Sequence, residues 1–121
     1  MRDFAGETYY KQLVACGTTL GASSSTSSVD METCRNGKVI VDFVKVNDDF
    51  TTLNIQHSSD DSTFTTHTAI GAIAATENDS YDCLRLKRYV RLNWTRNGVA
   101  GGSSWAAYIV GNQALRSPIE D

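Results

Sequence analysis

The stretch Leu84–Thr95, L-R-L-K-R-Y-V-R-L-N-W-T, decides the fold class of this 121-residue chain. Its apolar side chains fall on one parity, namely Leu84, Leu86, Val90, Leu92 and Trp94. The other parity is cationic or polar, namely Arg85, Lys87, Tyr89, Arg91, Asn93 and Thr95. Because successive side chains of a strand point to opposite faces, the pattern predicts a β-strand with an apolar face and a basic back. Arg88 breaks the parity and is expected to mark a bend, a bulge or the true start of the strand.

Other segments show the same kind of pattern. Tyr9–Cys16, Leu53–His57 and Ser104–Gly111 are each predicted as strands. Val39–Val46, V-I-V-D-F-V-K-V, is the most apolar run, and it carries apolar side chains on both parities. Such a segment is typical of a central strand, or of a strand whose outer side forms an interface.

Polar segments are expected to connect these strands. Gly17–Ser28 consists of small residues and is predicted as a long loop or a sheet-edge segment. The pair Asn36-Gly37 indicates a hairpin turn. Glu77–Asp82 is expected to be an acidic loop, and Asn97–Ser103 a flexible hairpin loop.

Seven or eight short strands with frequent turn signals, and no helical period, predict an all-β fold. We therefore expect a single-domain antiparallel β-sandwich, jelly-roll-like, over residues 1–121. Residues 1–8 and 112–121 are expected to form short extended arms or tails.

The overall composition limits the function classes. The chain carries 14 acidic against 11 basic residues, a net charge of −3, so its total charge gives no support to nucleic-acid binding. No run approaches the roughly 20 apolar residues of a membrane span, and no secretory signal is visible at the N-terminus. The cysteines Cys16, Cys34 and Cys83 lack C-x-x-C spacing, which favours reduced thiols made in a cytosol. A Cys16–Cys34 disulfide is the alternative.

No motif indicates catalysis or a cofactor. The sequence contains no G-x-S-x-G, no H-E-x-x-H and no phosphate-cradling glycine loop, so we expect no enzyme. His57 and His67 flank a predicted hairpin and are expected to approach across it, but zinc sites need three or four ligands at tight spacing. The acidic loops lack the alternating pattern of a calcium loop, and acidic turns are the usual way to end strands.

The basic back of the deciding stretch favours a binding role. Arg85, Lys87 and Arg91 interleave with Tyr89, which fits a protein partner with an acidic patch. The same residues outline a single-strand nucleic-acid platform, although the acidic total opposes it. An ordinary solvated sheet face, whose charges prevent aggregation, is the third interpretation.

Three segments together resemble a known class of protein: Ser27–Met31 (S-S-V-D-M), Leu53–Phe64 (L-N-I-Q-H-S-S-D-D-S-T-F) and Arg88–Trp94 (R-Y-V-R-L-N-W). The combination resembles small all-β virion proteins of tailed bacteriophages. Ser62 stands where that pattern usually has glycine, so the hairpin here is expected to be longer or of another turn type. The last two segments also look like discoidin-type carbohydrate- or lipid-binding jelly rolls, which are longer, usually secreted and tied by a disulfide.

The phage resemblance implies a capsid decoration or cement protein, placed on the virion surface and made in the host cytoplasm. Its implied partners are the major capsid protein and further copies of itself, as a trimer or dimer, with a neck or tail position as an alternative. A discoidin-like carbohydrate-binding module on the virion is the other alternative. The residues expected at the partner interface are Val39, Val41, Phe43, Arg85, Lys87, Tyr89, Arg91, Trp105 and Tyr108.

Overall fold

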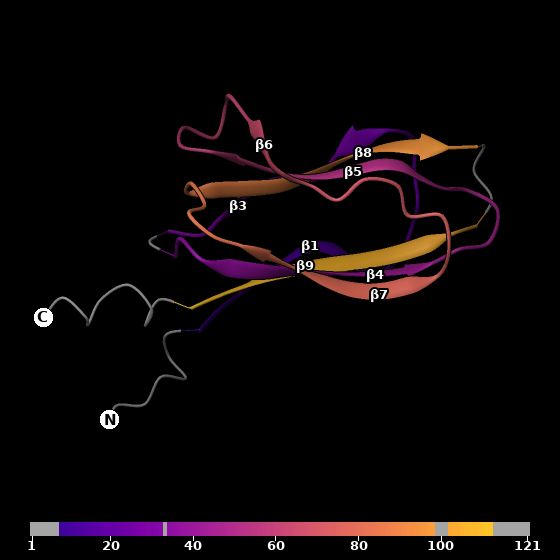
Figure 1. Ribbon diagram of the computed structural model, residues 1–121, viewed down its shortest axis with the longest axis horizontal. Coiled ribbons are helices and arrows are strands. Elements are labelled where there is room, and N and C mark those ends of the chain that lie inside the picture. The colour runs from indigo at the N-terminus through magenta and orange to yellow at the C-terminus, as the bar shows by residue number, and fades with distance from the viewer. Residues whose placement is uncertain (1–7, 33, 99–101, 113–121) are drawn as a thin grey trace, which may run out of the picture.

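The computed structural model describes residues 8–32, 34–98 and 102–112, which form nine strands in two antiparallel sheets packed face to face (Figure 1). Sheet A has the order β1-β9-β4-β7, with bounds Thr8–Thr19, Ser104–Asn112, Gly37–Val44 and Glu77–Cys83. Sheet B has the order β2-β8-β5-β6, with bounds Ser24–Ser25, Tyr89–Asn97, Asp49–Ser58 and Thr65–Ala69. Strand β3, Val29–Asp30, also pairs with β8.

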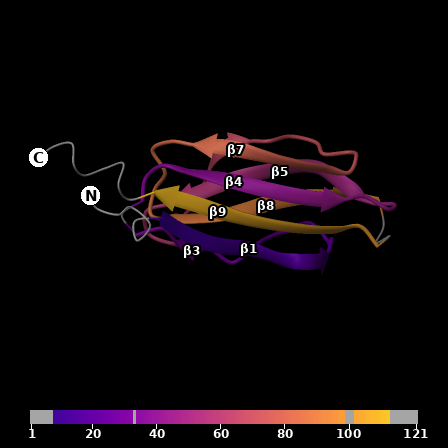
Figure 2. The same cartoon turned by 90° about the horizontal axis from the view of Figure 1, so that it is seen from below.

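The short strands β2 and β3 behave as one interrupted strand. Strand β2 pairs with β8 at Asn93 and Trp94, and β3 pairs with it at Tyr89 and Val90. Counted in this way, each sheet has four strands, which is the eight-stranded double layer of a jelly roll. Figure 2, seen from below, shows the four strands of sheet A side by side. The predicted all-β, jelly-roll-like sandwich is therefore confirmed.

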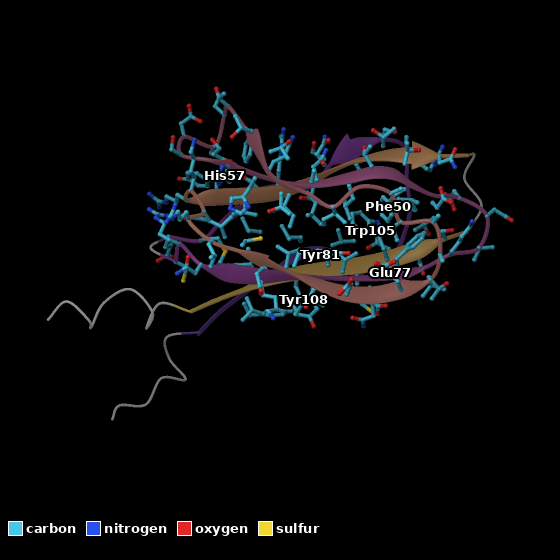
Figure 3. All side chains as sticks on the ribbon, in the orientation of Figure 1. Phe50, His57, Glu77, Tyr81, Trp105 and Tyr108 are labelled. Carbon is cyan, nitrogen blue, oxygen red and sulfur yellow. The ribbon has the colours of Figure 1, made fainter. Side chains whose placement is uncertain are left out.

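The core lies between the sheets and contains a row of four aromatic rings that alternates between them. Phe43 of sheet A contacts Phe50 of sheet B at a centroid distance of 5.0 Å. Phe50 contacts Trp105 of sheet A at 4.9 Å, and Trp105 contacts Trp94 of sheet B at 5.1 Å. Figure 3 shows Phe50 and Trp105 between the two layers. Such tilted and edge-to-face pairs add about 0.5–1.5 kcal/mol each beyond the burial of their area.

The deciding stretch is a strand in its second part only. Arg88 lies in a bend directly before β8, which begins at Tyr89, so the bend is the expected outcome that the structure shows. Val90 and Leu92 are buried as the parity predicts. The prediction is wrong for residues 84–88, which form a loop in which Arg85 has a left-handed φ of 60°.

Three connector predictions are also wrong. Residues 77–82 are not a loop but part of β7, because their backbone pairs in register with β4 while its edge position leaves most of its acidic side chains in water. The Asn36-Gly37 pair and the segment 97–103 do not form hairpins, because each connects a strand of one sheet to a strand of the other. Residues 99–101 lie outside the described residues.

The segment Gly17–Ser28, predicted as a long loop or a sheet edge, contains both: residues 17–19 end β1, and residues 24–25 form β2 at the edge of sheet B. Hydroxyl side chains hold it against β8: Ser23 Oγ accepts a hydrogen bond from the Arg96 amide at 2.9 Å, and Thr26 Oγ1 accepts one from the Leu92 amide at 3.0 Å. Ser25 Oγ accepts a further bond from Asn93 Nδ2 at 2.8 Å. Short hydroxyl side chains therefore supplement a backbone pairing of only two residues.

The two ends of the described chain lie together, because Thr8 of β1 pairs with Asn112 of β9. Apart from these two strand residues, the predicted arms 1–8 and 112–121 lie outside the described residues. Within the described part of the chain, no helix is long and apolar enough to cross a membrane.

Gly37 provides a test of the packing between β4 and β9. A Cβ atom at Gly37 would lie 2.8 Å from the backbone oxygen of Val110, closer than real contacts allow. We expect Gly37→Ala to lower the free energy of unfolding by about 1–3 kcal/mol, in the range of an overpacked core. A Cβ atom at Gly21 would meet no atom within 4 Å, so Gly21→Ala should change that free energy by less than about 0.5 kcal/mol. Urea unfolding followed by tryptophan fluorescence measures both, and equal effects would contradict this account.

Candidate partner-binding surface

Four of the residues expected at the interface lie in the core instead. Val39, Val41 and Phe43 are at most 1% exposed and Trp105 is 3% exposed, so a partner cannot reach them in the folded protein. The physical reason is the parity of β4 and β9: these side chains face sheet B. Because β4 is apolar on both parities, its sequence did not tell which side faces inward.

The outward parity of sheet A carries the apolar surface. Ile40 of β4 pairs with Tyr108 of β9, which pairs in turn with Gln12 of β1. In the next row, Tyr10 pairs with Val110. Tyr108, an expected interface residue, lies on this outer face (Figure 3), and its ring is 5.1 Å from that of Tyr10, which is 57% exposed.

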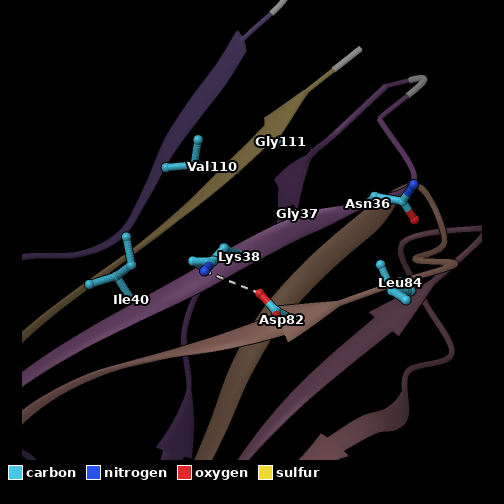
Figure 4. A pocket seen from close by; sticks show the side chains of 8 residues that line it. All are labelled: Asn36, Gly37, Lys38, Ile40, Asp82, Leu84, Val110 and Gly111. Atoms are coloured by element: carbon cyan, nitrogen blue, oxygen red, sulfur yellow. Dashed lines mark ion pairs between the residues drawn. The ribbon is translucent and has the colours of Figure 1, made fainter. Parts of the chain in front are cut away.

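An open groove of about 460 Å³ crosses this face where β4, β7 and β9 meet (Figure 4). It is lined by Asn36, Gly37, Lys38, Ile40, Asp82, Leu84, Val110 and Gly111. Its apolar wall includes Leu84, which is 64% exposed. Lys38 Nζ and Asp82 Oδ1 lie 3.3 Å apart in an exposed ion pair that spans β4 and β7. We call the surface formed by Tyr10, Ile40, Leu84, Tyr108 and Val110 the sheet-A face.

The residues of the predicted basic back do not form one surface. Arg85 and Lys87 are exposed on the loop between β7 and β8. Tyr89 and Arg91 lie on β8, whose outward side is the other face of the sandwich. The Arg91 guanidinium lies 4.1 Å above the Phe64 ring, and its Nε donates to Gln56 at 2.8 Å. Whether any of these four residues binds a partner remains a prediction.

The three sequence segments that carry the phage resemblance meet at one end of the sandwich. Asp30 accepts two hydrogen bonds of 2.8 Å from Arg88, which lower the pKa of Asp30 to about 2. Ser28 Oγ donates to the Asp61 carboxylate of the β5–β6 turn. These contacts connect segments 33 and 58 residues apart, a juxtaposition that the sequence alone could not show.

The β5–β6 turn has its left-handed residue one position before Ser62. Asp61 has a φ of 60°, and Ser62 does not adopt a left-handed conformation. Asp60 accepts hydrogen bonds from the amides of Thr63 and Ser62 and from Ser58 Oγ, and the bond from Thr63 is the largest cause that lowers its pKa to about 2. This carboxylate therefore shapes the turn.

His57 and His67 approach across the β5–β6 hairpin as predicted, with ring centroids 4.9 Å apart. His57 Nδ1 accepts a hydrogen bond from the Lys87 amide at 3.1 Å. His67 Nε2 lies 2.7 Å from the carbonyl oxygen of Leu84, and its Nδ1 lies 2.7 Å from Thr68 Oγ1. Among the described residues, no group of three or more His, Cys, Asp or Glu side chains could hold a metal ion.

The fold is a jelly-roll sandwich, and solved structures of similar fold include phage-derived and viral proteins. No protein-family model and no curated protein matches the chain. Among solved structures, the PBSX exported protein XepA matches with a TM-score of 0.59 and 18% identity, over 87% of this chain and 37% of that one. The SPBc2 prophage-derived protein YomS matches with a TM-score of 0.56 and 10% identity, over 87% of this chain and 93% of that one.

A chain of the T13 IBDV viral particle also matches, with a TM-score of 0.53 and 11% identity, over 93% of this chain and 33% of that one. At such low identities the likeness shows the fold. The chain spans just over a third of XepA and most of YomS. The predicted resemblance to small all-β phage proteins is therefore confirmed for the fold.

The cysteines allow a simple check of the structure. Cys16 is exposed and Cys34 and Cys83 are buried, and the Cys16–Cys34 disulfide is not formed. Burial is the largest cause that raises the pKa of Cys83 to about 11, so this thiol stays protonated and unreactive at neutral pH. We expect a chromogenic thiol reagent to modify Cys16 alone in the native protein and all three cysteines after denaturation. A native protein without a reactive thiol would indicate that Cys16 is bridged.

Proposed function

We propose that this protein is a non-enzymatic structural component of a tailed-phage virion, which decorates or cements the capsid through the sheet-A face. The observation that carries the proposal is this exposed apolar surface, with its groove, on a sandwich whose fold occurs in phage-derived proteins and in a viral particle. The proposed partners are the major capsid protein and further copies of this chain, as a trimer or dimer. A neck or tail position is the alternative within the same class.

The physical case rests on what the sheet-A face offers a partner. Contiguous exposed apolar surface on a soluble protein commonly marks a binding site, and tyrosines are among the side chains that contribute most to interface energies. Tyr10 and Tyr108 supply such side chains, and Leu84 adds an exposed aliphatic wall. The ion pair of Lys38 and Asp82 places both signs of charge in the groove, which favours one docking register.

A decoration role requires no chemistry beyond this. Many identical copies bind a capsid lattice, so modest individual contacts add up where neighbouring copies are connected. Several described residues with a shifted pKa serve the fold: Asp30 and Asp60 are held by hydrogen bonds, and Tyr81 is half-buried beside Glu77.

Leu84 provides the direct test, because it is exposed and its replacement should leave the fold intact. We expect Leu84→Asp to weaken binding to empty capsids by about tenfold or more, corresponding to about 1.4 kcal/mol, since a charge replaces an apolar wall of the groove. Val46→Asp is the matched control, because Val46 is 56% exposed and does not line the groove. Co-sedimentation with empty capsids measures both variants. A wild-type protein that ignores capsids, or equal losses in both variants, would count against the proposal.

A second candidate function is carbohydrate binding on the outer face of sheet B. Cross-strand pairs place Asn54 beside Asn93 and Gln56 beside Arg91, and Ser25 extends the first of these rows. These rows contain amide, guanidinium and hydroxyl groups and no carboxylate. Planar amides that donate and accept hydrogen bonds suit a ligand rich in hydroxyl groups, so this face favours a glycan over a charged polymer.

A glycan array followed by a thermal-shift assay tests this second function. A bound glycan should raise the melting temperature, by the equivalent of about 2.7 kcal/mol at 100 times its dissociation constant. Asn54→Ala should remove the rise, because it deletes one amide from the row. Ser80→Ala, on the opposite sheet, should keep it. No shift with any glycan would exclude the carbohydrate function and leave the capsid proposal standing.

A further inference from the structure

The loop of residues 84–88 closes one end of the sandwich, and other parts of the chain hold its backbone. His67 Nε2 lies 2.7 Å from the Leu84 carbonyl oxygen, and Asn36 Oδ1 accepts a hydrogen bond from the Arg85 amide at 3.2 Å. His57 Nδ1 accepts one from the Lys87 amide at 3.1 Å. Figure 3 shows His57 at this end, between the layers. Two of these three side-chain contacts come from the histidine pair.

The chemistry of these contacts fixes the protonation of both rings. A backbone amide only donates, so His57 Nδ1 must carry no proton when it accepts from Lys87. A carbonyl oxygen only accepts, so His67 Nε2 must carry a proton. His67 can gain a second proton without losing its contact with Leu84, because its Nδ1 faces the Thr68 hydroxyl, which donates or accepts. Of the two histidine contacts with the loop, only that of His57 requires a neutral ring. The bonds from the Arg85 amide to Asn36 and from the Leu86 amide to the Arg35 carbonyl do not depend on it.

The surroundings of His57 oppose its positive charge. Burial is the largest cause that lowers the pKa of His57, followed by the charges of His67 on β6 and Lys87 on the loop. Val90, which pairs with His57 on β8, is uncharged. On the turn after β5, the Asp60 carboxylate accepts hydrogen bonds from residues of that turn. The effects that act on His57 therefore all favour the neutral ring.

The loop also forms part of the sheet-A face. Leu84 lines the groove together with Ile40 and Val110, and two residues later Leu86 is buried in the core with 2% exposure. A loop that detaches from His57 and His67 would therefore move a wall of the groove and expose an apolar side chain. Lys87, whose amide His57 binds, lies three positions after Leu84, which lines the groove. The backbone of the loop therefore connects the histidine contacts to the shape of the groove.

We propose that His57 and His67 form a latch that holds the Leu84 loop closed at neutral pH and releases it on acidification, so that acid weakens docking at the sheet-A face. The inference rests on the proposed function for its consequence, but the latch itself is a property of the isolated protein. Protonation of His57 Nδ1 places two N–H donors against each other and two like charges on neighbouring rings.

The direction of the pH dependence follows from the protonation of His57. The closed loop binds a proton at His57 more weakly than the open loop does, because the pKa is lowered below the ordinary 6.5. The closed state is therefore fully favoured above that value and is lost as the pH falls below it. In the pH range where the open loop binds a proton at His57 and the closed loop does not, the open population rises by about tenfold for each pH unit of acidification.

Hydrogen exchange of the Lys87 amide, followed by NMR, tests the latch. After correction for the intrinsic pH dependence of exchange, the wild-type protein should lose protection by about tenfold per pH unit as the pH falls from 6.5 toward the lowered pKa of His57. In His57→Asn the side-chain oxygen takes roughly the place of Nδ1, so it accepts the same bond but does not titrate. Protection in this variant should stay constant across the same pH range. Unchanged wild-type protection, or the same loss in His57→Asn, would overturn the latch.

Two further measurements test the role of the histidines in the latch. His67→Gln keeps an N–H donor for Leu84 but removes one of the charges that lower the pKa of His57, so the acid-dependent loss should persist but be smaller. Should His57→Asn fold poorly, the loss of Lys87 protection in the wild-type protein must lie between pH 6.5 and the titration midpoint of the native His57 ring. A loss outside that pH range would overturn the proposal.

Capsid co-sedimentation at neutral and acidic pH separates the latch from the proposed function. We expect wild-type binding to fall on acidification and His57→Asn binding to persist. Absence of binding at neutral pH would refute the docking role and leave the exchange result to decide the latch. Binding that persists in acid while Lys87 protection is lost would refute the coupling between the latch and the groove.

Discussion

The structure depends on one physical constraint: the two sheets must be held face to face by side chains that fill the space between them. The aromatic row of Phe43, Phe50, Trp105 and Trp94 meets this constraint directly, because consecutive rings come from opposite sheets. Aliphatic side chains of β4, β5, β8 and β9 fill the rest of the core. A chain of this length buries enough apolar surface in this way to fold without a disulfide.

Because the inner faces are fixed by the core, the outer faces are free to differ. The outer side of sheet A presents tyrosine, isoleucine and valine around a groove, whereas that of sheet B presents amide, hydroxyl and guanidinium groups. A sandwich with two chemically different faces can bind a capsid by one face and present the other to the surroundings. The proposed capsid role and the second, carbohydrate-binding role therefore use separate surfaces and do not exclude each other.

The sequence by itself determined the fold class and the inward parity of most strands. Alternation in Leu53–His57, Tyr89–Thr95 and Ser104–Gly111 is a local property of the backbone, so it could be read without a partner strand. It also placed the two histidines across one hairpin, because a segment of serine and aspartate residues connects their strands.

Only the tertiary structure decided which strands pair, and the pairing in turn decides which residues form the candidate surface. Glu77–Cys83 is a strand because β4 offers it a ladder, and Val39, Val41 and Phe43 are core residues because sheet B covers their parity. Neither fact could be predicted from the segment alone. An acidic segment can be a loop or an edge strand, and a strand with apolar residues on both parities can face the core with either side. The groove likewise combines residues of β4, β7, β9 and a loop, which come together only when two sheets of non-consecutive strands close on one core.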